Sequence, residues 1–272
     1  MLIYSSNPLE IIKSVWRNRN LIKVLVKREI LCRYKGSMFG LLWSFLIPLF
    51  SLIVYTFVFS TVLKAKWSVG GESKAEFALV LFAGLLVFNL FSDCINRAPT
   101  LILNNQNYVT KVIFPLEILA LVVVGAAIFQ FLIGLGVLLL GFTLIFGLPP
   151  STMFNLPLII MPLTLLIIGI SWFISSLGVY LRDINQIVFL VTTLLMFLSP
   201  IFYPVTALPN EYQKLLFLNP LTFIIEQFRV IIFLGEMPNY LGLIAYSLIS
   251  LLIMFFGFIW FQKTRRGFGD VI

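Results

Sequence analysis

The chain has 272 residues, of which 60% are hydrophobic and 11% charged, and its mean hydropathy is +1.05. A soluble domain of this length does not need so much apolar surface, because its outside faces water. The composition therefore excludes an ordinary soluble enzyme and places most of the chain in lipid. Backbone N–H and C=O groups in lipid have to be paired within their own segment, so the spans are predicted to be helices. The alternating ten-residue strands of a membrane barrel are absent from the sequence.

The first 39 residues are predicted to form a cytoplasmic amphipathic segment that lies in the plane of the lipid headgroups. An apolar stripe that includes Leu21, Val24 and Leu25 runs between basic side chains, a pattern typical of interfacial helices. An ordinary solvated tail is the alternative. The first 20 residues are charged and hold no long apolar run, so a cleavable signal peptide is not expected.

Six apolar segments then follow in residues 40–272, which are predicted to form one transmembrane domain. A helix needs roughly 20 apolar residues to cross ~30 Å of hydrocarbon. The predicted spans are about 40–63, 77–91, 118–146, 156–179, 187–202 and 241–261. A seventh apolar run, 220–234, is short and carries Glu226 and Arg229, so we interpret it as interfacial or re-entrant.

The distribution of basic residues predicts the orientation of these spans. Six spans put both termini on one side of the membrane, and fourteen of the 19 lysines and arginines fall on that side. Because cytoplasmic loops carry the excess of Lys and Arg, both termini are predicted to be cytoplasmic. The basic balance is better explained by anionic lipid headgroups, or by an anionic lipid-linked substrate, than by nucleic acid.

Two connectors have compositions of their own. The cytoplasmic loop 92–115 mixes apolar residues with an amide-rich cluster at 104–107, which fits a docking surface for a soluble partner or a plain linker. The outer segment 204–240 is broken by prolines and is predicted to hold two short helices that dip back into the membrane, at about 209–218 and 220–234. Asn219 is the expected cap of the second helix and Pro220 suits its first turn. This segment is a candidate outer gate.

The sequence lacks the residues of most catalytic sites. It contains no histidine, and Cys32 and Cys94 alone do not make a metal site. No Gly-x-x-x-x-Gly-Lys-Ser/Thr loop and no Gly-x-Ser-x-Gly elbow occurs. The spans are almost free of the acidic residues that ion-driven transporters carry at mid-membrane. We therefore expect no cofactor in this chain and an energy source outside it.

Aromatic side chains are the main feature of the predicted membrane interior. Aromatic faces stack on the C–H groups of sugar rings and tolerate many sugars, so they suit the lining of a polymer path. Lipid contact, core packing and interfacial belts are the alternative roles of such residues. The candidate path residues are Trp43, Phe50, Tyr55, Phe57, Phe59 and Phe88.

An ordered set of short motifs covers nearly the whole chain. It begins with RYKGSMFGLLWS at residues 33–44 and includes LRDI at 181–184, SPIFY at 199–203, Asn219-Pro220 and GFGDV at 267–271. In this order the motifs resemble the permease subunits of type-2 ABC exporters for O-antigen, capsule and teichoic-acid polymers. Each motif alone is weak, whereas the ordered set is specific.

The resemblance implies a homodimer of permeases in the bacterial inner membrane with two copies of a separate ATPase that binds ATP and Mg²⁺. The implied substrate is a polysaccharide on a polyprenyl diphosphate lipid, moved out of the cytoplasm. Four basic residues are candidate headgroup contacts, with topology and lipid anchoring as the alternative: Lys27, Arg28, Arg33 and Lys35. Loop 92–115 is the candidate ATPase coupling loop, with Asn105, Asn107, Tyr108 and Lys111. The candidate outer-gate residues are Pro200, Tyr203, Asn219, Pro220 and Arg229.

Other classes compete with this interpretation. A membrane-embedded polyprenyl-phosphate enzyme needs acidic residues at the level of the lipid headgroup. The acidic residues near that level are Asp93, Glu117 and Asp183. Export by a variant without these three acids would exclude such an enzyme. An ion-coupled flippase would stop when the proton gradient collapses at constant ATP. A drug permease is a closer alternative, which the ordered polysaccharide-type motifs disfavour.

Overall fold

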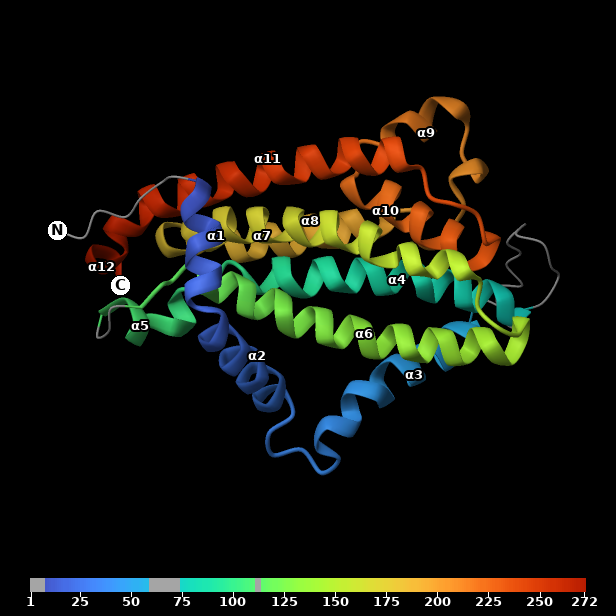
Figure 1. The fold of residues 1–272 in the computed structure, drawn as a ribbon, viewed down its shortest axis with the longest axis horizontal. Helices are drawn as coiled ribbons and strands as arrows, with labels where there is room; N and C mark the ends of the chain where they lie inside the picture. The colour runs from blue at the N-terminus through green and yellow to red at the C-terminus, as the bar shows by residue number, and fades with distance from the viewer. Residues whose placement is uncertain (1–7, 59–73, 111–113) are drawn as a thin grey trace.

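The computed structural model describes residues 8–58, 74–110 and 114–272, and these residues form helices and no strands. Four long helices lie side by side along the longest axis (Figure 1): α4 (Lys74–Arg97), α6 (Ile118–Phe146), α7 (Leu156–Tyr180) and α11 (Tyr240–Thr264). One continuous apolar core joins them. The predicted all-α class is confirmed.

Five helical segments of the described chain are long and apolar enough to cross a membrane: Gly40–Val58, Glu76–Arg97, Ile118–Phe146, Ser151–Tyr180 and Tyr240–Val271. The predicted span 187–202 instead corresponds to α8 (Ile184–Leu198), which has 15 residues. At ~1.5 Å per residue this helix is about 22 Å long, short of the ~30 Å of hydrocarbon. It ends where Ser199 adopts an extended conformation ahead of Pro200.

The bundle has two ends that differ in content (Figure 1). Helices α1 (Pro8–Arg17), α5 (Gln106–Thr110) and α12 (Phe268–Val271) lie at one end, which we call the terminal end. The connection between α6 and α7, together with α9 (Asn210–Leu216) and α10 (Pro220–Arg229), lies at the distal end. At Gly147 the chain leaves α6 with φ of 86°, a conformation that glycine adopts at little cost.

Helices α2 (Arg19–Arg33) and α3 (Trp43–Tyr55) form a V whose apex stands away from the four long helices (Figure 1). The α2 arm packs on α6, where Gly125 allows Val26 to approach. The α3 arm is peripheral: only 11% of its apolar window is buried, against 83% for α4. Hence α4 is the central helix of the bundle, and α3 offers most of its surface outward.

Among the described helices, α7 and α11 make the most extensive contact. A Cβ added to Gly257 would lie 2.2 Å from the carbonyl oxygen of Gly169, and one added to Gly169 would lie 2.5 Å from the Cα of Met254. Small residues at such positions let helix backbones touch in a membrane, where packing rather than hydrophobicity drives association.

The predicted loop 92–115 is partly helical. Helix α4 continues to Arg97, six residues beyond the predicted end of the second span, and α5 begins at Gln106 after a 3-10 turn, Leu103–Asn105. The outer segment holds α9 and α10, and α10 passes into a π-helical turn, Val230–Leu234. The Asn219 side chain accepts from Leu221 N, and Pro220 opens α10, which confirms both assignments at this helix start.

Candidate functional site

A cavity of about 710 Å³ lies between the V and the bundle. Its walls come from the end of α2, from α3, from the terminal half of α4 and from α6. We call it the main cavity. The wall is polar towards the terminal end, with Arg33, Asp93, Asn96 and Arg97, and becomes apolar and aromatic along α3 and α6, with Tyr55 and Phe131. A cavity with an ionic mouth and an apolar interior suits a ligand that has a charged head and an apolar body.

A short chain of hydrogen bonds fixes the apex of the V over this cavity. The Tyr34 hydroxyl donates to Gln130 Oε1 over 2.9 Å, and Gln130 Nε2 donates to the backbone oxygen of Ser44 over 2.8 Å. Burial raises the pKa of Tyr34, so this hydroxyl keeps its proton at physiological pH. Gln130 therefore joins both arms of the V to α6.

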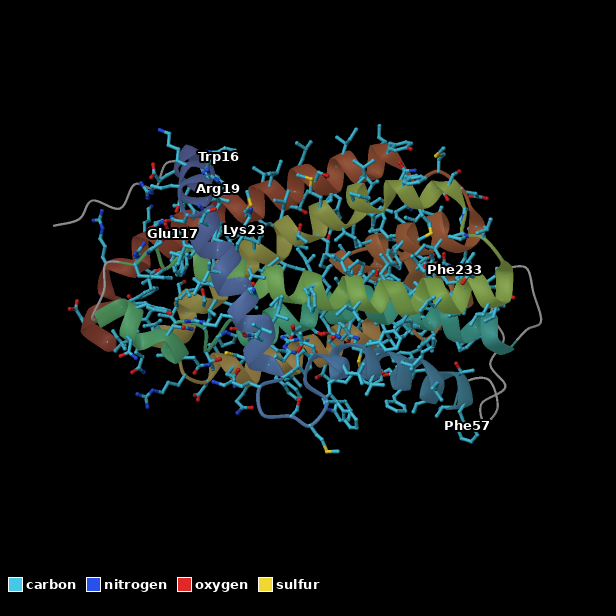
Figure 2. All side chains as sticks on the ribbon, turned by 60° about the horizontal axis from the view of Figure 1, so that its bottom comes forward. Trp16, Arg19, Lys23, Phe57, Glu117 and Phe233 are labelled. Atoms are coloured by element: carbon cyan, nitrogen blue, oxygen red, sulfur yellow. The ribbon has the colours of Figure 1, made fainter. Side chains whose placement is uncertain are left out.

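The predicted path aromatics separate into three groups. Trp43 and Tyr55 line the main cavity. Phe50 on α3 and Phe57 in the helical turn that follows α3 are more than half exposed, and Figure 2 shows Phe57 projecting away from the bundle. Phe88 is 5% exposed in the core and is not on the cavity wall, where the next residue, Asn89, takes its place. Phe59 lies outside the described residues.

The four predicted basic contacts also separate. Arg33 lines the main cavity and donates to Asp93 Oδ2 over 2.7 Å. Lys27, Arg28 and Lys35 instead line an open groove on the other face of α2. Arg28 donates to the Tyr108 hydroxyl over 3.0 Å, and this hydrogen bond raises the pKa of Arg28. Sequence periodicity did not separate these faces, because α2 carries basic residues all round.

The described coupling residues, Asn105, Asn107 and Tyr108, lie at the terminal end. The Tyr108 ring stacks on Phe114 with 4.2 Å between centroids. The Asn105 side chain donates to the backbone oxygen of Leu101. Asn107 is exposed, and Lys111 lies outside the described residues. Through Arg28 and Tyr108, α2 is in direct contact with this segment.

At the distal end, Arg229 is buried and joins three elements. Its guanidinium donates to the backbone oxygens of Val80 on α4 and of Pro200 and Ile201 before α9, and to Glu226 on its own helix. Asn219 donates to Ser199 Oγ over 2.8 Å. The Tyr203 hydroxyl donates to the Phe197 oxygen over 2.9 Å, and burial raises the pKa of Tyr203. The five predicted gate residues thus form one connected region.

A polar cluster at the terminal end was missed by sequence reasoning. The Glu117 carboxylate accepts from Arg265 and from Ser14, and its backbone oxygen accepts from Trp172. Figure 2 places Glu117 between α1 and the ends of the long helices. These partners are far apart in sequence, and the apolar run that starts at 118 gave no signal of them. Among the described residues no group of three or more His, Cys, Asp or Glu side chains could hold a metal ion.

The described residues form several apolar helices long enough to span a membrane, around a cavity with a charged mouth, which is the architecture of a multi-span membrane protein. The family model for the ABC-2 type transporter matches residues 20–233, and the chain belongs to this family. The chain is 26% identical to the O-antigen export system permease protein RfbA of Myxococcus xanthus, over 97% of this chain and 100% of that protein. It is 24% identical to the polysialic acid transport protein KpsM of Escherichia coli, over 87% of this chain and 90% of that protein. It is 25% identical to the capsule polysaccharide export inner-membrane protein CtrC of Neisseria meningitidis serogroup B, over 92% of each chain.

Proposed function

We propose that this chain is the membrane subunit of an ATP-driven exporter, and that its cargo is an anionic, lipid-linked polysaccharide of the O-antigen or capsule kind. The cargo's lipid anchor is a polyprenyl diphosphate, and export runs from the cytoplasm outward across the bacterial inner membrane. The observation that carries the proposal is the main cavity in a chain of the ABC-2 family whose relatives are named as O-antigen and capsule permeases.

The chemistry of the main cavity fits both parts of such a cargo. Arg33 and Arg97 at the mouth can attract phosphate oxygens, for which arginine offers paired donors. Trp43 and Tyr55 further in offer aromatic faces to sugar rings. The terminal end, with its basic α2, then faces the cytoplasm and its anionic lipid surface.

A second copy of the chain completes the path in this proposal. The outer face of the first span, Gly40–Val58, carries Phe50, Ile53 and Phe57, each more than half exposed, and α8 exposes a similar apolar row. On the side away from the bundle the main cavity is bounded by the V, whose α3 arm is peripheral. We infer that two permeases pair so that these faces meet each other or lipid, and that Phe50 and Phe57 reach the path only from that pairing.

The two ends of the bundle take different roles. The chain has no Walker loop, so ATP and Mg²⁺ are bound by two copies of a separate ATPase. That subunit docks at α5, where Asn107 is exposed and Tyr108 leads to α2 through Arg28. The Arg229 region at the distal end is the outer gate, which must loosen for cargo to leave.

The test is reconstitution of this chain in lipid vesicles with the ABC ATPase of the same exporter and a fluorescent polyprenyl-diphosphate oligosaccharide. We expect transport with ATP, and none with the permease alone or with an ATPase whose catalytic glutamate is changed to glutamine. Transport that survives without the ATPase, or that stops when an ionophore collapses the proton gradient at constant ATP, would overturn the proposal.

The same vesicle assay distinguishes an O-antigen cargo from a capsule cargo. The relatives include both kinds of permease, and a teichoic acid exporter is a further alternative. Supplying each class of polymer on its own lipid anchor, at equal concentration, assigns the cargo by its rate of transport.

A further inference from the structure

Two ion pairs join α2 to the terminal half of α4 in a reciprocal arrangement. Arg33 on α2 donates to Asp93 on α4, and Arg97 on α4 donates to Glu29 on α2. The two charges that each helix contributes to these pairs, one acidic and one basic, are four residues apart, about one turn. We call these four residues the α2–α4 clasp.

Both pairs are open to exchange of partners. The four side chains are between 29% and 33% exposed, so water and small anions can reach them. Ion pairs that are this exposed contribute little to stability, because solvent screens them and ordering long side chains costs entropy. A ligand with more charge than a single carboxylate can therefore compete for the arginines.

Arg97 has unused capacity to bind an anion. Its Nη1 is buried and has no hydrogen-bond partner, although a guanidinium can donate five hydrogen bonds. The same side chain lies on the wall of the main cavity and on the wall of a second cavity of about 310 Å³, which also includes Glu29 and Asn105. A buried charged donor without a partner is costly, and a phosphate oxygen would satisfy it.

We propose that Arg33 and Arg97 form a diphosphate-binding site at the mouth of the main cavity, and that a bound diphosphate replaces Asp93 and Glu29 as their partner, so that the ligand itself bridges α2 and α4. The inference deepens the proposed function and rests on it. Because a diphosphate is larger than a single carboxylate, α2 shifts on α4 to make room for it. Since Arg28 on α2 bonds to Tyr108, this shift is transmitted to the segment around α5.

Variants of the clasp residues test the proposed site by whether each substitution weakens or strengthens diphosphate binding. Arg97→Gln and Glu29→Gln break the same ion pair, so a purely structural role changes both variants in the same direction. In an exchange of partners, Arg97→Gln removes a ligand, whereas Glu29→Gln and Asp93→Asn remove competitors. We expect binding of farnesyl diphosphate to the full chain in phosphatidylcholine nanodiscs to weaken about tenfold in Arg97→Gln and to strengthen severalfold in both carboxylate variants.

Lys23→Gln is the matched control, since Lys23 is an exposed basic residue of α2 that lines neither cavity (Figure 2). It should bind like the wild type. If Arg97→Gln does not give a monodisperse protein, the carboxylate variants alone decide: stronger binding supports the site, and unchanged or weaker binding overturns it.

Competing probes show which chemical group the site recognises. Inorganic pyrophosphate should compete with farnesyl diphosphate, and farnesol should not. Equal competition by phosphatidylglycerol in the nanodisc would assign the site to membrane lipid and overturn the diphosphate site. Permease that binds no diphosphate but still exports with its ATPase would overturn this inference alone, whereas binding without ATP-driven export would overturn only the proposed function.

The shift of α2 has its own readout in the native cysteines. Cys32 on α2 is exposed and Cys94 on α4 is buried, so a nitroxide reagent labels α2 selectively. Farnesyl diphosphate should change the spectrum of the label at Cys32 in the wild type. An unchanged spectrum at saturating probe would overturn the shift of α2.

Discussion

Arg265, near the end of the chain, donates to Glu117 at the start of α6 over 2.7 Å. Both side chains are buried, at 8% and 10% exposure. Arg265 also donates to the backbone oxygen of Phe114, and Ser14 donates to the second carboxylate oxygen of Glu117. The contact therefore binds α1, the entry to α6 and the end of α11 into one unit at the terminal end.

The first prediction follows from this burial. Arg265→Met leaves the Glu117 carboxylate in an apolar site without its cation, which should cost about 3 kcal/mol of stability. The adjacent Arg266 is exposed, so Arg266→Met is the matched control and should change stability little. Thermal unfolding of both variants in detergent measures the difference. Equal melting temperatures would mean that the Glu117–Arg265 pair contributes no stability.

The second prediction concerns the space that Arg229 occupies. A Cβ added to Gly84 would lie 2.7 Å from Arg229 Nη2, so Gly84→Ala should push the guanidinium off the Ile201 oxygen and cost about 1–3 kcal/mol. The control is Gly136→Ala, because nothing lies within 4 Å of a Cβ at this helical position. It should be neutral or stabilising by up to about 1 kcal/mol. A Gly84→Ala protein as stable as Gly136→Ala would show that the Arg229 contacts rearrange freely.

The third prediction uses the Tyr34–Gln130 hydrogen bond. Tyr34→Phe should cost about 1 kcal/mol, since it leaves Gln130 Oε1 without a donor. Burial raises the pKa of Tyr34, so below pH 9 the hydroxyl is protonated in both the folded and the unfolded chain. The stability difference from the wild type should be constant between about pH 6 and 9. It should decline above about pH 10, where the unfolded chain releases the tyrosine proton and the folded chain retains it. Chemical unfolding across this pH range checks both parts.

The fourth prediction separates the aromatics of the first span, Gly40–Val58, by their position. Tyr55 lines the main cavity, and Phe57 is 60% exposed on the outer face. Tyr55→Ala should slow vesicle export severalfold without changing assembly with the ATPase. Phe57→Ala should instead weaken association of two permeases, seen as a shift in crosslinking yield. Identical export rates for wild type and Tyr55→Ala would remove the cavity aromatics from the transport path.

The long helices were largely predictable because each is one apolar run. The predicted span 118–146 is α6 itself, and 156–179 differs from α7 by one residue. Hydropathy alone gave the wrong helix end where a helix carries polar residues that line a cavity. The second predicted span stopped at residue 91, ahead of Asp93 and Asn96. The spacing of Asn89, Asp93 and Asn96, four and three residues, nevertheless places them on one face of α4, and that face lines the main cavity. Helical periodicity among the polar residues was the signal that could have found this wall.

Pairings over long separations could not be predicted. Arg229 and Asn219 were chosen from the sequence, and the structure connects them through the Ser199–Ile201 segment, but no local pattern identifies Val80 as a partner. In the same way, Arg97 was one basic residue in a presumed loop. Its contact with Glu29 depends on how α2 crosses the bundle. The spacing of residues along the chain gives no information about that crossing.

The glycine contact between α7 and α11 determines where this protein is able to move. The backbones of α7 and α11 touch at Gly169 and Gly257, so the two helices cannot slide past each other without a steric collision. They are therefore expected to move as one rigid unit. We therefore expect that a conformational change driven by an ATPase moves the V of α2 and α3, while α7 and α11 keep their positions relative to each other.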